Sequence, residues 1–192
     1  MNQRIIGIFE ESARVKTAFV RDNADRIEDV VRLIAASFRD GKKVILFGNG
    51  GSATDASHIA AEFVNRFLMD RPPLPAIALN TDPAVITSIG NDFGFDQLFA
   101  KQLAALGQEG DVVIAISTSG NSPNVLKALD VAKRKSMKTV VLTGGTGGKM
   151  ANLADHTFIV PSTHTPHIQE THITLGHVIC QMVDELLFGG KG

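Results

Sequence analysis

The chain has 192 residues, of which 44% are hydrophobic and 20% are charged, a composition that excludes disordered, collagenous and coiled-coil proteins and predicts one globular domain over residues 1–192. Nineteen basic and twenty acidic residues leave a net charge of −1, so no basic surface for nucleic acid is expected, and an anionic ligand must be held by local geometry. With one cysteine, no signal peptide and no apolar run of the roughly 18 residues that a membrane span needs, the protein is expected to be cytoplasmic and without a membrane partner.

Two helices are expected at the start of the chain, over residues 3–21 and 24–40. In the second segment, apolar residues from Ile27 to Phe38 recur at helical spacing, and Gly41 stands just past the expected end. Because these helices lie outside any alternation of strands and helices, we expect them to pack partly against further copies of the chain.

Five short apolar runs without polar alternation follow, which is typical of strands buried on both faces of a parallel sheet. They cover residues 43–47, 76–79, 112–116, 139–142 and 157–160. Helical segments are expected between them, near residues 53–69, 83–90, 96–106, 122–135 and 148–154, and a last amphipathic helix over 168–188. This alternation predicts a doubly wound α/β domain with a five-stranded parallel sheet.

Loop 117–122, Ser-Thr-Ser-Gly-Asn-Ser, follows the third predicted strand and precedes a helix. Ligands of open α/β sheets bind beyond the carboxyl ends of the strands, and a helix N-terminus attracts phosphate. Ser122 alone could simply cap the helix. Since a cap does not account for four hydroxyl groups in six positions, we predict a phosphate site formed by Ser117, Thr118, Ser119 and Ser122.

Residues 48–53, Gly-Asn-Gly-Gly-Ser-Ala, follow the first predicted strand and match the G-x-G-x-x-G/A pattern of dinucleotide folds. The match is weak, because the second strand ends in Asn80, where an acid that binds ribose would be expected. The segment could serve only as a turn between strand and helix. We prefer a role in which its backbone N–H groups and Asn49 bind substrate hydroxyls.

Two predicted helices each carry a pair of polar side chains on one face. His58 and Glu62 are four residues apart, and Gln169 and His177 are eight apart, whereas His172 lies on another face. The spacing leaves open a metal site, an acid–base site or a mere surface pair. The remaining histidines are expected on the surface or in loops: His156, His164 and His167.

Five separated segments carry these residues: GNGGSATDASHIAAEF, SIGNDFGF, ISTSGNSPNV, LTGGTGGKMANLAD and IQETHITLGH. Together they resemble bacterial phosphoheptose isomerases, a family with the sugar isomerase (SIS) fold, over nearly the whole chain. The resemblance implies an aldose–ketose isomerase that converts sedoheptulose 7-phosphate to D-glycero-D-manno-heptose 7-phosphate, the first step toward heptose for lipopolysaccharide or other surface glycans. It also implies a homotetramer that uses residues 1–40 in assembly, with sites at subunit interfaces and one zinc ion per subunit.

The same resemblance implies roles for individual residues. Loop 117–122 would hold the phosphate with Ser52 nearby, and the sugar chain would contact Asn49, Gly50, Gly51, Asn91 and Asp92. Glu62 and His177 would be the acid–base pair, and Arg66 a basic group close to the site. Zinc would be held by His58, Glu62, Gln169 and His177, of which Glu62 and Gln169 would also contact the substrate.

The chain departs from the family at Pro166 and His167, which replace an Asp and an Arg of many members. The stretch 65–82 also resembles a non-enzymatic paralogue that binds the replication initiator protein. Such an adaptor needs no acid–base pair, and a sugar-phosphate sensor needs loop 117–122 but not Glu62 or His177. Because the chain keeps both residues, we prefer an isomerase in which Glu62 removes a proton next to the carbonyl, giving an enediol, and His177 is its partner.

Overall fold

The computed structural model of the protein describes residues 1–190. At its centre lies a five-stranded sheet in which every neighbouring pair of strands is parallel, in the order β2-β1-β3-β4-β5. The strands are β1 (Val44–Gly48), β2 (Ala76–Ala78), β3 (Val112–Ile116), β4 (Lys138–Gly144) and β5 (His156–Val160). The chain winds outward from β1 to β2 and then in the other direction from β3 to β5, so the doubly wound α/β fold is confirmed.

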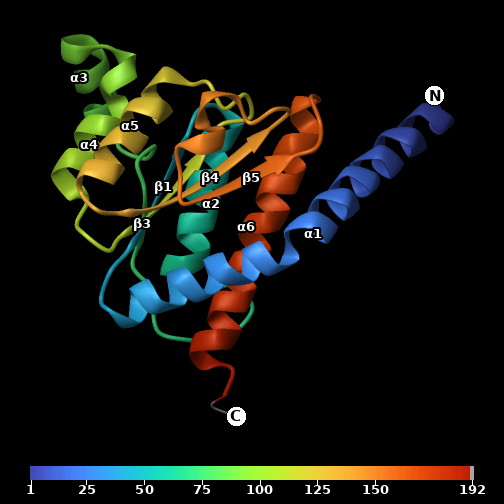
Figure 1. The fold of residues 1–192 in the computed structure, drawn as a ribbon, viewed down its shortest axis with the longest axis horizontal. Coiled ribbons are helices and arrows are strands. Elements are labelled where there is room, and N and C mark those ends of the chain that lie inside the picture. The colour runs from blue at the N-terminus through green and yellow to red at the C-terminus, as the bar shows by residue number, and fades with distance from the viewer. Residues whose placement is uncertain (191–192) are drawn as a thin grey trace.

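Helices cover both faces of the sheet (Figure 1). One face packs against α1 (Asn2–Arg39), α2 (Gly51–Val64) and α6 (Thr165–Phe188), and the other against α3 (Pro83–Phe93), α4 (Leu98–Leu106) and α5 (Pro123–Arg134). Two short 3₁₀ helices complete the chain, η1 (Phe95–Gln97) and η2 (Gly148–Asn152).

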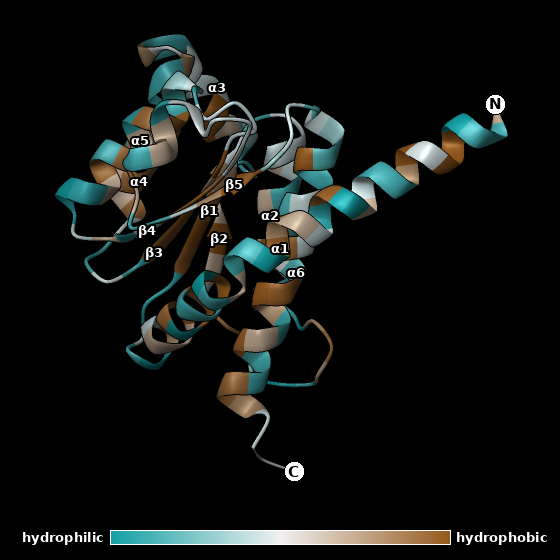
Figure 2. Ribbon diagram, turned by 45° about the vertical axis from the view of Figure 1, so that its right-hand side comes forward, coloured by the Kyte–Doolittle hydropathy of each residue, from teal (hydrophilic) through white to brown (hydrophobic). Residues whose placement is uncertain are grey.

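Strand β1 shows why the sheet is buried on both sides. Val44 and Leu46 belong to the core beneath α1, α2 and α6, whereas Ile45 and Phe47 belong to the core beneath α4 and α5. All four side chains are fully buried. The strands are accordingly mostly apolar in Figure 2, as the apolar runs predict.

The prediction of two helices before β1 is wrong, because α1 is continuous through residues 22 and 23. Asn23 is buried, and its side-chain amide donates to the carbonyl of Phe19 at 2.9 Å while its Oδ1 accepts from Arg26 at 3.0 Å. With its polar atoms paired along the helix, Asn23 does not interrupt it. Residues 1–10 are exposed, and this end of α1 projects away from the sheet (Figure 1).

The helix expected over 53–69 is too long, because α2 ends at Val64. Arg71 binds the free carbonyl groups at this end of the helix. Its guanidinium donates to Phe63 O at 2.6 Å and to Glu62 O at 2.9 Å. Charge on a guanidinium is favourable at a helix C-terminus, so this contact fixes where α2 stops. The helix expected over 148–154 is the 3₁₀ helix η2.

No helix among residues 1–190 combines the length and the apolar character needed to cross a membrane.

Candidate active site

Loop 117–122 lies at the carboxyl end of β3, where its hydroxyl groups face one another. Ser122 occupies the N-cap position of α5, but its side chain makes no capping hydrogen bond. Its Oγ lies 3.0 Å from Ser117 Oγ instead. Because the hydroxyl does not close the helix end, the simple capping role is not the one that Ser122 plays. The backbone N–H groups of Val125 and Leu126 donate to Ser122 O instead, at 3.1 and 3.0 Å.

The glycine loop after β1 is tied to the start of α5. The amides of Asn49 and Asn124 exchange two hydrogen bonds, both of 2.9 Å. Gly50 has a φ of 57°, a left-handed conformation that favours glycine, at the N-cap position of α2. The loops after β1 and β3 are therefore held side by side, although the side chain of Asn49 is already engaged within the chain.

His58, Glu62 and His177 meet at the contact between α2 and α6. His58 Nε2 lies 2.9 Å from Glu62 Oε1 and 3.5 Å from His177 Nε2. One ligand atom from each of the three residues lies within 4.8 Å of the other two. The predicted convergence of the two helix faces is thus present for these three side chains, which we call the His-Glu-His cluster.

Of the two histidines in the cluster, His177 is the more buried. The ring of Phe67 stacks on it at 5.3 Å between centroids, with an interplanar angle of 16°, and the His58 ring meets it edge-on at 5.0 Å. Burial, together with the charge of His58, lowers the pKa of His177 below its usual value, although Glu62 acts in the opposite direction. The imidazole is therefore neutral at pH 7 and able to accept a proton.

The side chain of Gln169 lies further up the same helix contact. Its amide occupies the space that a Cβ atom on Gly51 would take. Gly51 begins α2, seven residues before His58, which is about 10 Å along the helix axis. Gln169 therefore borders the glycine loop, and its role as a zinc ligand stays a prediction.

Within residues 1–190, no side-chain hydrogen bond or ion pair joins the other expected site residues to the His-Glu-His cluster. Asn91 and Asp92 are exposed on α3, where the Asn91 amide donates to Asp92 Oδ1 at 2.7 Å. Arg66 is exposed and follows the end of α2, so it does not continue the helix face of Glu62. Ser52 is buried in the first turn of α2.

The expectation of surface or loop positions for the remaining histidines is wrong for His167, whereas His156 is half-buried in the edge strand β5. His167 is buried in the first turn of α6, with Nδ1 3.6 Å from Glu170 Oε2, because α1 crosses this end of α6. His164, at the N-cap position of α6, is exposed as expected.

Sequence reasoning assigned no role to three residues near the cluster. Phe67 contacts His177 from the segment after α2, and no sequence spacing connects the two. His172 is almost completely buried. Asp55 lies one turn before His58, so the same helical spacing that selected Glu62 could have found it.

Comparisons with known proteins identify the family to which the chain belongs. The SIS domain family model matches residues 8–144. A phosphoheptose isomerase of Thermodesulfovibrio yellowstonii is 55% identical over 98% of this chain and 94% of its own length, and one of Aquifex aeolicus is 54% identical over 97% and 98%. The solved structure of a phosphoheptose isomerase from Neisseria gonorrhoeae superimposes with a TM-score of 0.90 at 41% identity, covering 96% of this chain and 98% of that one.

Proposed function

Because the chain belongs to the SIS domain family and, within it, to the phosphoheptose isomerases, we propose that this isomerase converts sedoheptulose 7-phosphate to D-glycero-D-manno-heptose 7-phosphate at the His-Glu-His cluster. The observation that carries the assignment is the meeting of two imidazoles and one carboxylate from two helices, with His58 and His177 119 residues apart in the chain. A packed pair of helices does not need titratable groups at its contact, whereas proton transfer needs an acid and a base close together.

The dimensions of the site suit an open-chain sugar phosphate. The glycine loop and His58 are separated by about 10 Å along α2. An extended seven-carbon chain spans a comparable length, so its phosphate could lie at the carboxyl ends of β1 and β3 while its first two carbons reach the cluster. Hydroxyl and backbone N–H groups supply the contacts, which agrees with the absence of tryptophan and tyrosine from the sequence.

Glu62 and His177 divide the proton transfers. Aldose–ketose isomerisation moves a proton between C1 and C2 through an enediol. Glu62 removes the proton next to the carbonyl, and the neutral ring of His177 takes up and returns the hydroxyl proton. His58, which lies 2.9 Å from Glu62 and 3.5 Å from His177, holds both groups in place.

The cluster also fits a zinc ion. Two histidines and one glutamate form a donor set of known catalytic zinc sites, and their ligand atoms already lie within 4.8 Å of one another. His58, Glu62 and His177 would hold the ion, with Gln169 as the predicted fourth ligand. When bound, zinc supplies a Lewis acid that polarises the substrate carbonyl.

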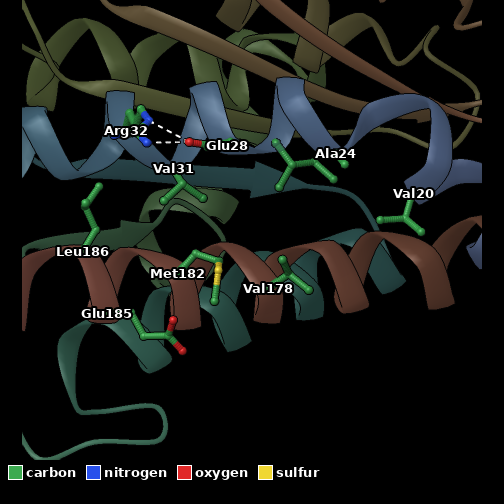
Figure 3. Close-up of a pocket in the computed structure, with 10 residues that line it drawn as sticks. Val20, Ala24, Glu28, Val31, Arg32, Val178, Met182, Glu185 and Leu186 are labelled. Atoms are coloured by element: carbon green, nitrogen blue, oxygen red, sulfur yellow. Dashed lines mark hydrogen bonds and ion pairs between the residues drawn. The ribbon is translucent and has the colours of Figure 1, made fainter. Parts of the chain in front are cut away.

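We further propose that four copies of the chain assemble through α1 and α6. Figure 3 shows an apolar groove between these helices, whose lining includes Val20, Val31, Val178, Met182 and Leu186. Ile5 and Phe9, on the projecting part of α1, are 48% and 74% exposed. Phe19 and Ile27, by contrast, are buried within the chain. A second copy that covers the groove and the projecting helix would remove this apolar surface from water.

The test is to add sedoheptulose 7-phosphate to the purified protein and to detect the aldose product, with unphosphorylated sedoheptulose as the comparison. We expect conversion of the phosphate ester and far slower conversion of the free sugar. Binding without conversion would indicate a sugar-phosphate sensor, and the absence of both would favour the adaptor. Light scattering should give about four times the chain mass of 20.5 kDa. We also propose that the protein is cytoplasmic and that its product supplies heptose for lipopolysaccharide or another surface glycan.

A further inference from the structure

A small cavity lies between α2, α6 and the sheet, beside the His-Glu-His cluster. Its volume is about 10 Å³, and seven of its nine lining residues carry no polar side-chain atom: Leu46, Ile59, Ile114, Ile116, Leu142, Gly176 and Ile179. The other two are Asp55 and His172. Asp55 Oδ2 and His172 Nδ1 are buried and have no hydrogen-bond partner within residues 1–190. Buried polar atoms are almost always paired, so two such atoms on one apolar cavity require an explanation.

The hydrogen bonding of His172 defines what the cavity needs. His172 Nε2 lies 3.1 Å from the backbone carbonyl of Thr143. A carbonyl can only accept, so Nε2 carries the hydrogen. Burial lowers the pKa of His172 to about 4, which keeps the ring neutral at pH 7 and leaves Nδ1 as an acceptor. As a carboxylate Asp55 also accepts only, although burial raises the pKa of this group above its usual value against the opposing effect of His58.

Two acceptors that face one cavity are satisfied by a single molecule with two hydrogens to donate. A cavity of about 10 Å³ is at the size needed for one water, roughly 10–15 Å³. We propose that one buried water donates to both Asp55 Oδ2 and His172 Nδ1, and that Asp55 and His172 are positioning residues for the His-Glu-His cluster. The second half of this proposal rests on the proposed function of the cluster.

The location of the pair explains how it acts on the cluster. Asp55 lies three residues before His58 on α2, and His172 lies five residues before His177 on α6. Next to the cluster, α2 and α6 approach each other closely. A Cβ atom added to Gly176 would come within 2.5 Å of Ile59 Cδ1. A water that joins Asp55 to His172 therefore fixes the relative position of α2 and α6 one turn away from the cluster.

The connection extends to the loop expected to bind phosphate. Thr143, whose carbonyl accepts from His172, is followed by Gly144, whose N–H donates to Thr118 O at 3.1 Å. The buried water is thus the central member of a chain of hydrogen bonds from α2 through α6 and β4 to loop 117–122. It links the acid–base end of the site to the phosphate end.

Two variants test the pair, and neither is part of the cluster. Asp55→Ala and His172→Leu each remove one acceptor. Either change should lower zinc affinity about 10- to 100-fold, as the loss of residues that orient metal ligands does. kcat should fall with zinc affinity. Asp130→Ala, an exposed change on α5, should match the unmodified protein.

Three readouts distinguish positioning from a merely structural role. A high-resolution crystal structure should show one water within hydrogen-bond distance of Asp55 Oδ2 and His172 Nδ1, and its absence would overturn the bridge. Asp55→Asn keeps an acceptor oxygen and should restore zinc affinity that Asp55→Ala loses. The double variant should lose no more than either single variant, because each already removes the water. Additive losses would contradict the shared water.

The outcomes also separate this inference from the proposed function. Zinc affinity is measured by titration without substrate, so an isomerase assay that fails leaves the bridge and its effect on the cluster open to measurement. If the unmodified protein binds zinc and converts the substrate while Asp55→Ala and His172→Leu behave identically to it, the positioning role is wrong and the proposed function stands.

Discussion

Arg71 and Asp184 form an ion pair that is sealed inside the protein, with side chains 1% and 3% exposed and Arg71 Nε 2.9 Å from Asp184 Oδ1. Arg71 comes from the segment between α2 and β2, and Asp184 from α6. The remaining guanidinium hydrogens bind carbonyls at the end of α2, including that of Glu62. One side chain thus joins both helices of the His-Glu-His cluster.

Arg71→Met should be strongly destabilising, because it leaves the carboxylate of Asp184 buried without its partner. Breaking a buried pair in this way costs about 3–5 kcal/mol of unfolding free energy. Arg14→Met removes the exposed pair with Glu11 and should cost less than about 1 kcal/mol. Denaturant unfolding at equal protein concentration measures both. Equal losses in the two variants would contradict the structural role of the buried pair, and Arg71→Met combined with Asp184→Leu should recover part of the loss.

Gly51→Ala should impair the site while leaving the fold intact. The added methyl group would meet the side-chain amide of Gln169, which is the flexible end of a side chain and can move away. Displacement of a group that contacts substrate costs about a hundredfold in rate when it reaches 1 Å, so turnover should fall at least about tenfold. Gly90→Ala is the matched control, since nothing lies within 4 Å of its Cβ position. Unchanged turnover in Gly51→Ala would remove Gln169 from the site.

The burial of His172 should make stability depend on pH. The pKa of His172 is about 4 in the folded protein, against about 6.5 when unfolded. Between these values the unfolded chain binds a proton that the folded chain does not, so stability falls as pH decreases from about 6.5 to 4 and is unaffected above 6.5. The loss reaches about 3 kcal/mol. His172→Gln should unfold with a shallower dependence over this range, and an identical slope would exclude His172 as its source.

Glu62→Gln should lower turnover by about two to four orders of magnitude, because the amide keeps the shape of the side chain but cannot remove a proton. Glu109→Gln, an exposed change in the loop before β3, should leave the rate unchanged. Initial rates with sedoheptulose 7-phosphate measure both effects. Near-normal turnover in Glu62→Gln would assign the base to another residue.

Removal of metal should also abolish most activity. We expect zinc to co-purify at up to one ion per chain, chelation to reduce turnover, and added zinc to restore it. His58→Ala should weaken zinc retention while leaving the binding of inorganic phosphate unchanged, since loop 117–122 is built from other elements. Full activity in metal-free protein would leave Glu62 and His177 to act without a Lewis acid.

Sequence patterns predict the strands of the sheet and the residues of the His-Glu-His cluster. They do not predict the contacts that determine where α1 and α2 end or what packs on the cluster. Uninterrupted apolar runs such as residues 112–116 mark strands whose two faces are both covered, and the spacing of His58 and Glu62 needs only helical geometry. The continuity of α1 through Asn23 depends on side-chain hydrogen bonds, and the end of α2 depends on Arg71. The contact of Phe67 with His177 joins residues far apart in the chain, so no local sequence pattern predicts it.

The separation of His58 and His177 in the chain also orders events during translation. All five strands and α2 precede α6, so a growing chain exposes His58 and Glu62 before His177 and Asp184 have been synthesised. The three ligands of the His-Glu-His cluster and the Arg71–Asp184 ion pair are therefore complete only after all five strands of the sheet have been synthesised. If the cluster is the active site as proposed, activity therefore requires that α6 has been synthesised and packed against α2.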